Sequence, residues 1–433
     1  MNSEYKTRLF NGLPAVFCGD HWVIISPYAG ELVRLSQEQI DDPETKSQLD
    51  EKGFFGKPSE RGPGALSDYF QLTLITNSDC NLRCRYCFAN AGENRIVMDE
   101  KVAFAAVRYG IERAAGRDLL ISFFGGEPSL TPSLIKKVVA YARQSIIGTD
   151  VKRVRFNITT NGVMSLSFLN FLINNDFFLT ISMDGVPVVQ DYQRPLRKSI
   201  GGSTASSPIL ERTIRALVSR NHGFMIRATI TDYSVKYLVP TIEYLHGLGV
   251  TQFHCEVINL AGRAIMETKG QPMKRPSPEA FVKNLKATII RAGELGMGVL
   301  NSSYMNLMQP SVHFCDGVGG NRVSVSYTGE VTTCLEVQGG CHPTADYFIV
   351  GRYNEGEDKI SINPLKQLRI CGNAITSQNC CCHECFAIYT CGGGCPIRNY
   401  HMTGDQNTVD PFRCKVIKSI LPFVFDLFDR AIE

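Results

Sequence analysis

Three cysteines lie close together, directly after the first long apolar run of the chain. Cys80, Cys84 and Cys87 have the spacing Cys-x3-Cys-x2-Cys and follow the stretch YFQLTLITN. A structural zinc site needs four ligands, and neither Cys nor His follows Cys87 within ten residues. Three thiolates with an open position favour an iron–sulfur cluster whose remaining iron binds another molecule. A zinc site and three core cysteines are the alternatives.

A second, denser cysteine array lies near the C-terminus. It comprises Cys315, Cys334, Cys382, Cys385, Cys391, Cys395 and Cys414. The chain has sixteen cysteines in all, and a protein of 433 residues does not need disulfides for stability. Clustered thiols therefore predict metal ligation, although Cys-x2-Cys pairs and the stretch CCCHEC are also typical of zinc sites.

The composition limits the function classes. The 45 basic and 42 acidic residues give a net charge of +3, which is too balanced to predict binding to nucleic acid or to a membrane surface. No apolar stretch is long enough to span a membrane, and the N-terminal stretch MNSEYKTRLFNGLP lacks the apolar segment of a signal peptide. We therefore predict a cytoplasmic protein.

Strand-like and helix-like runs alternate six times in the middle of the chain. The strand-like runs are residues 69–77, 119–126, 153–162, 177–185, 224–231 and 251–259. This alternation predicts an α/β fold with parallel strands and outer helices, as a closed or partly closed barrel or as a doubly wound sheet. Chemically unusual residues lie at or near five strand ends, at Cys80, Gly125–Glu127, Thr160–Gly162, Ser182–Asp184 and Arg227–Thr229. Because barrels carry active sites at this edge, we expect these residues to meet.

Two regions flank this array, so we predict three parts: 1–68, 69–300 and 301–433. The first is a small α+β extension that ends in the linker-like stretch KPSERGPGALS. The last is rich in cysteine and glycine and is expected to need metal to fold. Residues 15–25 form either an ordinary hairpin strand or an edge strand that docks a peptide. Cys18 and Cys255 match no pattern and are expected in the core.

The first cysteine motif, with Tyr86 before its last cysteine, resembles the signature of the radical S-adenosylmethionine (SAM) enzymes. The resemblance implies a partial barrel of six β/α units. It also implies that Cys80, Cys84 and Cys87 hold a 4Fe–4S cluster whose unique iron is chelated by SAM. In this family the reduced cluster cleaves SAM to a 5′-deoxyadenosyl radical, which abstracts a hydrogen atom.

The strand-end motifs resemble the SAM-binding positions of the same family. The matching residues are Gly125, Gly126, Glu127, Pro128, Asn161, Ser182 and Arg227. The GGEP segment resembles the one that receives the SAM ammonium group, where a carboxylate is a charge-assisted acceptor. The serine and the arginine match positions that hold the SAM carboxylate, which a guanidinium binds with two donors. The asparagine matches a strand-end turn beside SAM.

The C-terminal array resembles the seven-cysteine pattern of the SPASM domain, which binds two auxiliary 4Fe–4S clusters in enzymes that modify peptides or proteins. Three clusters are therefore implied in total. The resemblance assigns one auxiliary cluster to Cys315, Cys334 and Cys395, and the other to Cys382, Cys385, Cys391 and Cys414. The first set lacks a fourth ligand. Either its iron is open and binds a substrate thiolate, or the ligand is one of His313, Cys341, Cys371, Cys380 and Cys381.

The family resemblance implies a maturase that oxidatively modifies a ribosomally made peptide by a thioether or carbon–carbon cross-link. The stretches DYQRP (191–195) and GGS (201–203) resemble a loop of such maturases, and residues 1–68 resemble a shortened leader-peptide-binding winged helix or form a lid. The expected partners are a precursor peptide and an electron donor such as flavodoxin or ferredoxin.

Two other functions stay open. In sulfatase maturases, which make formylglycine, an Asp follows the second cysteine of the SPASM domain. In this chain Leu335 and Glu336 follow Cys334, and no general base is identified. An iron–sulfur electron-transfer or sensor protein is the other alternative, which the complete set of SAM-binding positions disfavours.

Overall fold

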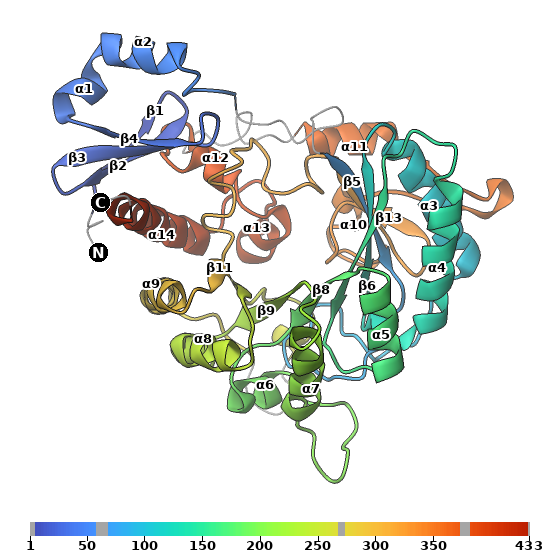
Figure 1. Ribbon diagram of the computed structural model, residues 1–433. Helices are drawn as coiled ribbons and strands as arrows, with labels where there is room; N and C mark the ends of the chain where they lie inside the picture. Colours follow the sequence, from blue (N-terminus) through green and yellow to red (C-terminus); the bar gives the residue numbers. More distant parts are fainter. Residues whose placement is uncertain (1–4, 58–67, 267–272, 373–381, 432–433) are drawn as a thin grey trace.

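A single sheet of eleven strands dominates the computed structural model, which describes residues 5–57, 68–266, 273–372 and 382–431 (Figure 1). Its strand order is β11-β10-β9-β8-β7-β6-β5-β12-β13-β14-β15. The six central strands are β5 (Tyr69–Ile75), β6 (Asp118–Phe124), β7 (Val154–Thr160), β8 (Phe178–Ser182), β9 (Phe224–Ile230) and β10 (Gln252–Val257). All are parallel to their neighbours, so the predicted alternation is confirmed.

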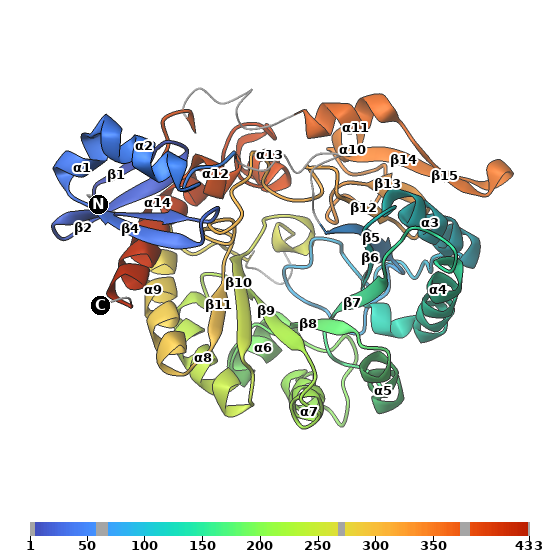
Figure 2. The ribbon, with the colours of Figure 1, turned by 45° about the horizontal axis from the view of Figure 1, so that its top comes forward.

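The connecting helices lie on the outer side of the curved sheet (Figure 2). They are α3 (Glu100–Arg113), α4 (Pro132–Ser145), α5 (Leu166–Asn174), α6 (Pro187–Gln193), α7 (Ser207–Val218), α8 (Leu238–Gly247) and α9 (Pro278–Glu294). Leu72 of β5 lies beside Ile121 of β6, and both side chains are fully buried. Burial on both faces is typical of parallel strands and explains their nearly continuous apolar sequence.

The sheet continues beyond residue 300 without a break. β11 (Gly298–Leu300) pairs with β10 at one edge, and β12 (Arg322–Val325) pairs in parallel with β5 at the other. β12 and β13 (Glu330–Thr332) form an antiparallel hairpin, and β14 (Ile349–Asn354) and β15 (Lys359–Ile362) extend it. The helices described after residue 300 are α10 (Ala345–Phe348), α11 (Pro364–Cys371), α12 (Ile388–Cys391), α13 (Pro396–Thr403) and α14 (Pro411–Arg430).

The N-terminal region is an antiparallel sheet in the order β1-β2-β3-β4. Its elements are β1 (Thr7–Phe10), β2 (Leu13–Cys18), β3 (His21–Ser26), β4 (Glu31–Leu35), α1 (Gln37–Asp41) and α2 (Pro43–Glu51). The edge-strand interpretation of residues 15–25 is wrong, because β2 and β3 are both central strands. Trp22 belongs to the separate core of this region. The linker-like stretch lies mostly outside the described residues.

The N-terminal sheet contacts the last helix, which brings the two ends of the chain together (Figure 1). The carboxylate of Asp429 pairs with Nε of Arg34 at 2.6 Å and with Nε2 of His21 at 3.0 Å. Cys18 is buried where β2 faces this helix, and Cys255 is buried in the main core, as predicted. No helix within the described residues combines the length and apolar character needed to cross a membrane.

Candidate functional site

A cavity of about 230 Å³ lies at the C-terminal ends of the parallel strands. Its lining includes Cys80, Cys84, Cys87, Gly125, Gly126, Glu127, Asn161, Ser182 and Arg227. The structure therefore brings together the first cysteine motif and most of the strand-end residues that the sequence singled out. Pro128 is buried beside this lining, where it begins a short 3-10 helix.

The first cysteine motif sits on a loop that is held from several sides. The backbone N–H groups of Arg83 and Arg85 donate to the carbonyls of Pro195 and Gln193. Leu82 is completely buried at the centre of the loop. Apolar burial and backbone hydrogen bonds therefore fix the loop in a single conformation at the end of β5.

Hydrogen-bond donors surround the sulfur atoms of this loop. The N–H of Leu82 lies 3.4 Å from Sγ of Cys80, and Nδ2 of Asn161 lies 3.7 Å from the same atom. Nη1 of Arg194 lies 3.9 Å from Sγ of Cys84. Such donors stabilise the negative charge of a thiolate and are typical neighbours of iron–sulfur clusters.

Burial raises the pKa of Cys84 to about 11 and also raises that of Cys80. At neutral pH these thiols are therefore protonated unless a cation binds them. Iron ions supply that positive charge, because metal binding displaces the thiol protons. Three converging thiols with polar donors around them fit a 4Fe–4S cluster.

Glu127 is anchored to the end of β7. Its carboxylate is 1% exposed and accepts hydrogen bonds from the hydroxyl of Thr160 (2.6 Å), from N–H of Asn161 (2.7 Å) and from N–H of Ser129 (3.0 Å). Burial raises its pKa even though these bonds act in the opposite direction. Since an ionised carboxylate accepts about four hydrogen bonds, one position remains for a ligand.

The glycines of the GGEP segment permit close packing on the cysteine loop. A Cβ atom added to Gly126 would lie 2.1 Å from the carbonyl oxygen of Asp79. The N–H of Glu127 donates to the same carbonyl at 2.7 Å. Glycine is thus required here for the close contact between the GGEP segment and the cysteine loop, in addition to any contact with a ligand.

Asp184 is the centre of a buried network under the cysteine loop. Its side chain is fully buried and pairs with Nε of Arg194 at 3.0 Å. It also accepts hydrogen bonds from the hydroxyl of Tyr86 and from Nε2 of Gln193, both at 2.6 Å, and from N–H of Thr229 at 2.9 Å. The network joins the cysteine loop to β8, α6 and β9.

Arg227 extends from β9 into the cavity. It lies in register with Ser182 of β8 and His254 of β10, so three neighbouring strands present side chains at one level. Within the described part of the chain, no carboxylate forms an ion pair with Arg227. A guanidinium in this position is suited to bind the carboxylate of a ligand.

A second cavity of about 400 Å³ adjoins the first and contains three C-terminal cysteines. Cys315, Cys334 and Cys395 all line it, and Nη2 of Arg322 lies 3.7 Å from Sγ of Cys315. The residues that line both cavities are Phe88, Phe124, Arg227, Glu256, Glu336 and Arg398. Together the cavities offer space of the size that proteins use for small-molecule ligands.

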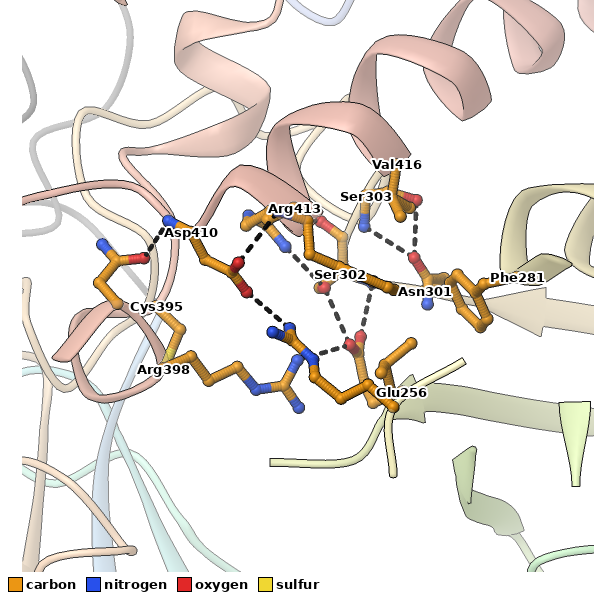
Figure 3. Close-up of a pocket in the computed structure, with 14 residues that line it drawn as sticks. Glu256, Phe281, Asn301, Ser302, Ser303, Cys395, Arg398, Asp410, Arg413 and Val416 are labelled. Carbon is orange, nitrogen blue, oxygen red and sulfur yellow. Dashed lines mark hydrogen bonds and ion pairs between the residues drawn. The ribbon is translucent and has the colours of Figure 1, made fainter. Parts of the chain in front are cut away.

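Two residues of the shared wall, Glu256 and Arg398, belong to a charged network (Figure 3). Nη1 of Arg398 lies 3.3 Å from Oε2 of Glu256, and the N–H and hydroxyl of Ser302 donate to the same carboxylate. Burial disfavours the ionised form of Glu256, but His254 and Arg398 outweigh it and lower the pKa well below its usual range. The pair is therefore charged and joins β10 to α13.

The other four cysteines of the C-terminal array do not line the second cavity. The N–H of Cys385 donates to the carbonyl of Cys382, Cys391 ends α12, and Cys414 lies in the first turn of α14. Of the residues considered as a fourth ligand for the first set, Cys341 is exposed, and Nε2 of His313 donates a hydrogen bond to the carbonyl of Cys371 at 2.7 Å. Cys380 and Cys381 lie outside the described residues.

Arg263 is a site residue that the sequence reasoning missed. It is 3% exposed, and its N–H and Nε donate to the carbonyls of Cys87 and Cys84, both at 3.0 Å. Gly262 before it has a positive φ of 54° and packs against the same loop. The stretch AGRA carries no recognisable motif, so only the three-dimensional contact identifies the arginine. Glu336 and Arg398 were likewise not predicted to line the cavities.

Comparison with known families identifies one model that matches the chain. Residues 74–252 match the family described as the radical SAM superfamily. This segment runs from the end of β5 to the start of β10 and includes the first cysteine motif with Gly125, Gly126, Glu127, Asn161, Ser182 and Arg227 of the cavity.

Three relatives illustrate the range of similar proteins. An uncharacterized protein of Methanocaldococcus jannaschii is 26% identical over 62% of this chain and 85% of its own length. The radical SAM cyclopropyl synthase TigE of Paramaledivibacter caminithermalis is 26% identical over 40% of each chain. A cysteine-type anaerobic sulfatase-maturating enzyme of Clostridium perfringens is 23% identical over 82% of this chain and 95% of its own length.

Two solved structures share the fold. The enzyme anSMEcpe with bound AdoMet and the Cp18Cys peptide superposes with a TM-score of 0.63 and 19% identity, over 84% of this chain and 98% of that chain. Streptococcus suis SuiB bound to precursor peptide SuiA gives a TM-score of 0.56 and 13% identity, over 95% and 99%. At these identities the likeness establishes a common fold, with a large parallel sheet and mixed α/β content.

Proposed function

The chain is an enzyme of the radical SAM superfamily, and on this basis we propose that it oxidatively modifies a ribosomally made peptide. The observation that carries the proposal is the convergence of Cys80, Cys84 and Cys87 with the SAM-type residues in one cavity. In this proposal the three thiolates hold a 4Fe–4S cluster. When bound, the cluster supplies the electron that cleaves SAM to a 5′-deoxyadenosyl radical.

The protein's own residues bind and orient SAM in this proposal. Arg227 and Ser182 receive the carboxylate, and the GGEP segment with the remaining acceptor position of Glu127 receives the ammonium group. Asn161 holds the turn beside SAM through its hydrogen bond to Asn81. Arg194 and Arg263 keep the cysteine loop in place and limit the access of water to it.

The C-terminal region is proposed to be a SPASM domain with two auxiliary clusters. Its support is the second cavity, where Cys315, Cys334 and Cys395 face the space that adjoins the SAM site. The other four cysteines of the pattern would hold the second cluster. We also propose that β5 to β10 with their helices form the partial barrel, that the parts divide at residues 68 and 300, and that a flavodoxin or ferredoxin supplies electrons.

A peptide substrate is supported by the adjoining cavities. A side chain that enters between them would lie near the residues proposed to hold SAM and those proposed to hold the first auxiliary cluster, which would supply an acceptor for the electron that the substrate radical loses. The structural neighbours include one with precursor peptide SuiA and one with the Cp18Cys peptide. For the bond that forms, we propose a thioether or carbon–carbon cross-link.

Formylglycine formation is the second candidate, and similarity to the Clostridium perfringens sulfatase-maturating enzyme over 95% of that enzyme supports it equally. The position that carries an Asp in such enzymes is occupied by Leu335. Glu336, the next residue, lines both cavities and places a carboxylate in that neighbourhood. Both candidates are oxidations of a peptide, and they differ in the fate of the side chain.

The experiment that tests the proposal has two steps. Anaerobically reconstituted protein is first incubated with SAM and dithionite, where formation of 5′-deoxyadenosine is expected and Cys84→Ala should abolish it. The protein is then co-expressed with candidate precursor peptides, including any short peptide encoded beside its gene. Loss of two hydrogens without an aldehyde indicates a cross-link, and a product that reacts with a hydrazide indicates formylglycine. Cluster-loaded protein that leaves SAM intact would contradict the proposal.

A further inference from the structure

Glu336, His342 and His401 form a group of potential metal ligands outside the cysteine sets. Each offers one ligand atom, and these atoms all lie within 4.8 Å of one another. Glu336 and His342 come from the loop between β13 and α10, whereas His401 comes from α13. The group is thus assembled by the tertiary fold and not by a local sequence motif.

The three side chains are packed closely and partly buried. Nε2 of His401 lies 2.7 Å from Oε1 of Glu336, and the side chains are 14% and 13% exposed. The rings of His342 and His401 stand edge to face, with centroids 5.9 Å apart. This arrangement resembles ligands around an ion more than a pair of exposed surface residues.

Neighbouring residues hold the ligands in place. Nδ2 of Asn259 lies 2.6 Å from both carboxylate oxygens of Glu336. The hydroxyl of Thr344 lies 2.9 Å from Nδ1 of His342, and the N–H of Thr344 lies 3.2 Å from the same nitrogen. The N–H donates to this nitrogen, and in metal sites contacts of this kind fix the orientation of the ligand ring.

We propose that Glu336, His342 and His401 bind one zinc ion. Two imidazole nitrogens and one carboxylate oxygen form a ligand set that suits zinc. Three protein ligands leave one position open, as in catalytic zinc sites. Glu336 lines both cavities, so the ion would be bound by a residue of the cavity wall. The site goes beyond the proposed function and requires neither SAM nor the clusters.

The test measures zinc in the intact, cluster-loaded protein. Anaerobically reconstituted protein is equilibrated with zinc, freed of excess ions by gel filtration, and analysed for zinc and iron by mass spectrometry. Zinc X-ray absorption then identifies the ligand atoms. We expect one zinc ion per chain with nitrogen and oxygen neighbours at about 2.0–2.1 Å. His401→Ala and His342→Ala should each lose this zinc while the iron content stays unchanged.

His254→Ala is the matched control. His254 also pairs with a carboxylate, that of Glu256 at 3.2 Å, and lines the second cavity, but it is not part of the three-ligand group. Its zinc content should equal that of the wild type. A zinc shell of sulfur at about 2.3 Å would assign the ion to the cysteines and overturn the proposal. Equal zinc in wild type and both ligand variants would overturn it as well.

Discussion

Replacing Asp184 with Asn should loosen the segment that carries the first cysteine motif. The substitution keeps the size of the side chain but removes the charge that faces Arg194 at 3.0 Å. Both side chains are buried, at 0% and 11% exposure, so water cannot replace the lost partner. Removing one member of a buried ion pair costs about 3–5 kcal/mol, because the other charge stays buried without compensation.

The cost should be largest in the protein without its cluster. Nη1 of Arg194 also lies 3.9 Å from Sγ of Cys84, and a cluster-bound thiolate offers the guanidinium a second negative partner. The hydroxyl of Tyr86 and the N–H of Thr229 lose their charged acceptor in both forms. We therefore expect the full 3–5 kcal/mol only in the cluster-free form.

Hydrogen exchange measured by mass spectrometry checks this magnitude locally. Since every 1.4 kcal/mol is a factor of ten, amides of residues 80–88 and 227–231 should exchange roughly a hundred- to a few thousand-fold faster in the cluster-free variant. Asp191→Asn is the control, because Asp191 caps the N-terminus of α7 through N–H groups and a hydroxyl, with no ion pair to a cation in the described structure. Asn caps helices as well as Asp does. Equal exchange in both variants would refute the reasoning.

Three further predictions concern other parts of the structure. In Glu127→Gln, either orientation of the side-chain amide turns its NH2 group toward a backbone N–H. We therefore expect a loss of about 1–3 kcal/mol of stability, measured as faster hydrogen exchange of the Asn161 amide. Burial opposes charge on His21, but hydrogen bonds to Asp20 and Asp429 raise its pKa. Docking of the N-terminal sheet should therefore be strongest below about pH 6.5 and weaken as the pH rises through the raised pKa. Protease resistance of that sheet at several pH values measures this, and Asp429→Asn should remove the pH dependence. Gly162→Ala should lower the thermal unfolding midpoint, because Gly162 has a φ of 75° and the new Cβ would lie only 2.3 Å from Leu210 of α7. An unchanged midpoint would show that the turn adapts.

The six parallel strands were predictable because their signal is local. Apolar runs of strand length alternate with amphipathic helices, and polar or glycine-rich turns separate each strand from the next helix. The position of Glu127 or Asn161 at the cavity then follows, since parallel strands share one edge for their C-terminal ends. What the sequence did not show is that the Glu127 carboxylate is engaged mainly by the end of β7.

Pairing between distant segments was not predictable from the sequence. Nothing in the local sequence of β12 indicates that it pairs with β5 and so extends the main sheet. The edge-strand interpretation of residues 15–25 failed for a different reason, because the short strands β1 and β4, which cover β2 and β3, were not recognised in the sequence. Arg263 illustrates the same limit, since its partners are backbone carbonyls of a distant loop.

The charged pair between Glu256 and Arg398 explains how the two cavities keep their relative position. Cys395 precedes the first residue of α13, and Arg398 follows it by three residues, so both lie on one side of the helix start. Arg398 is held by Glu256 at the end of β10, which His254 and Ser302 fix in turn. Cys395, which lines the second cavity, is thereby connected to β10 through the first turn of α13 and the ion pair between Arg398 and Glu256. Loss of Arg398 would therefore leave a buried carboxylate without its guanidinium and free the segment that presents Cys395, so the two cavities depend on each other for their geometry.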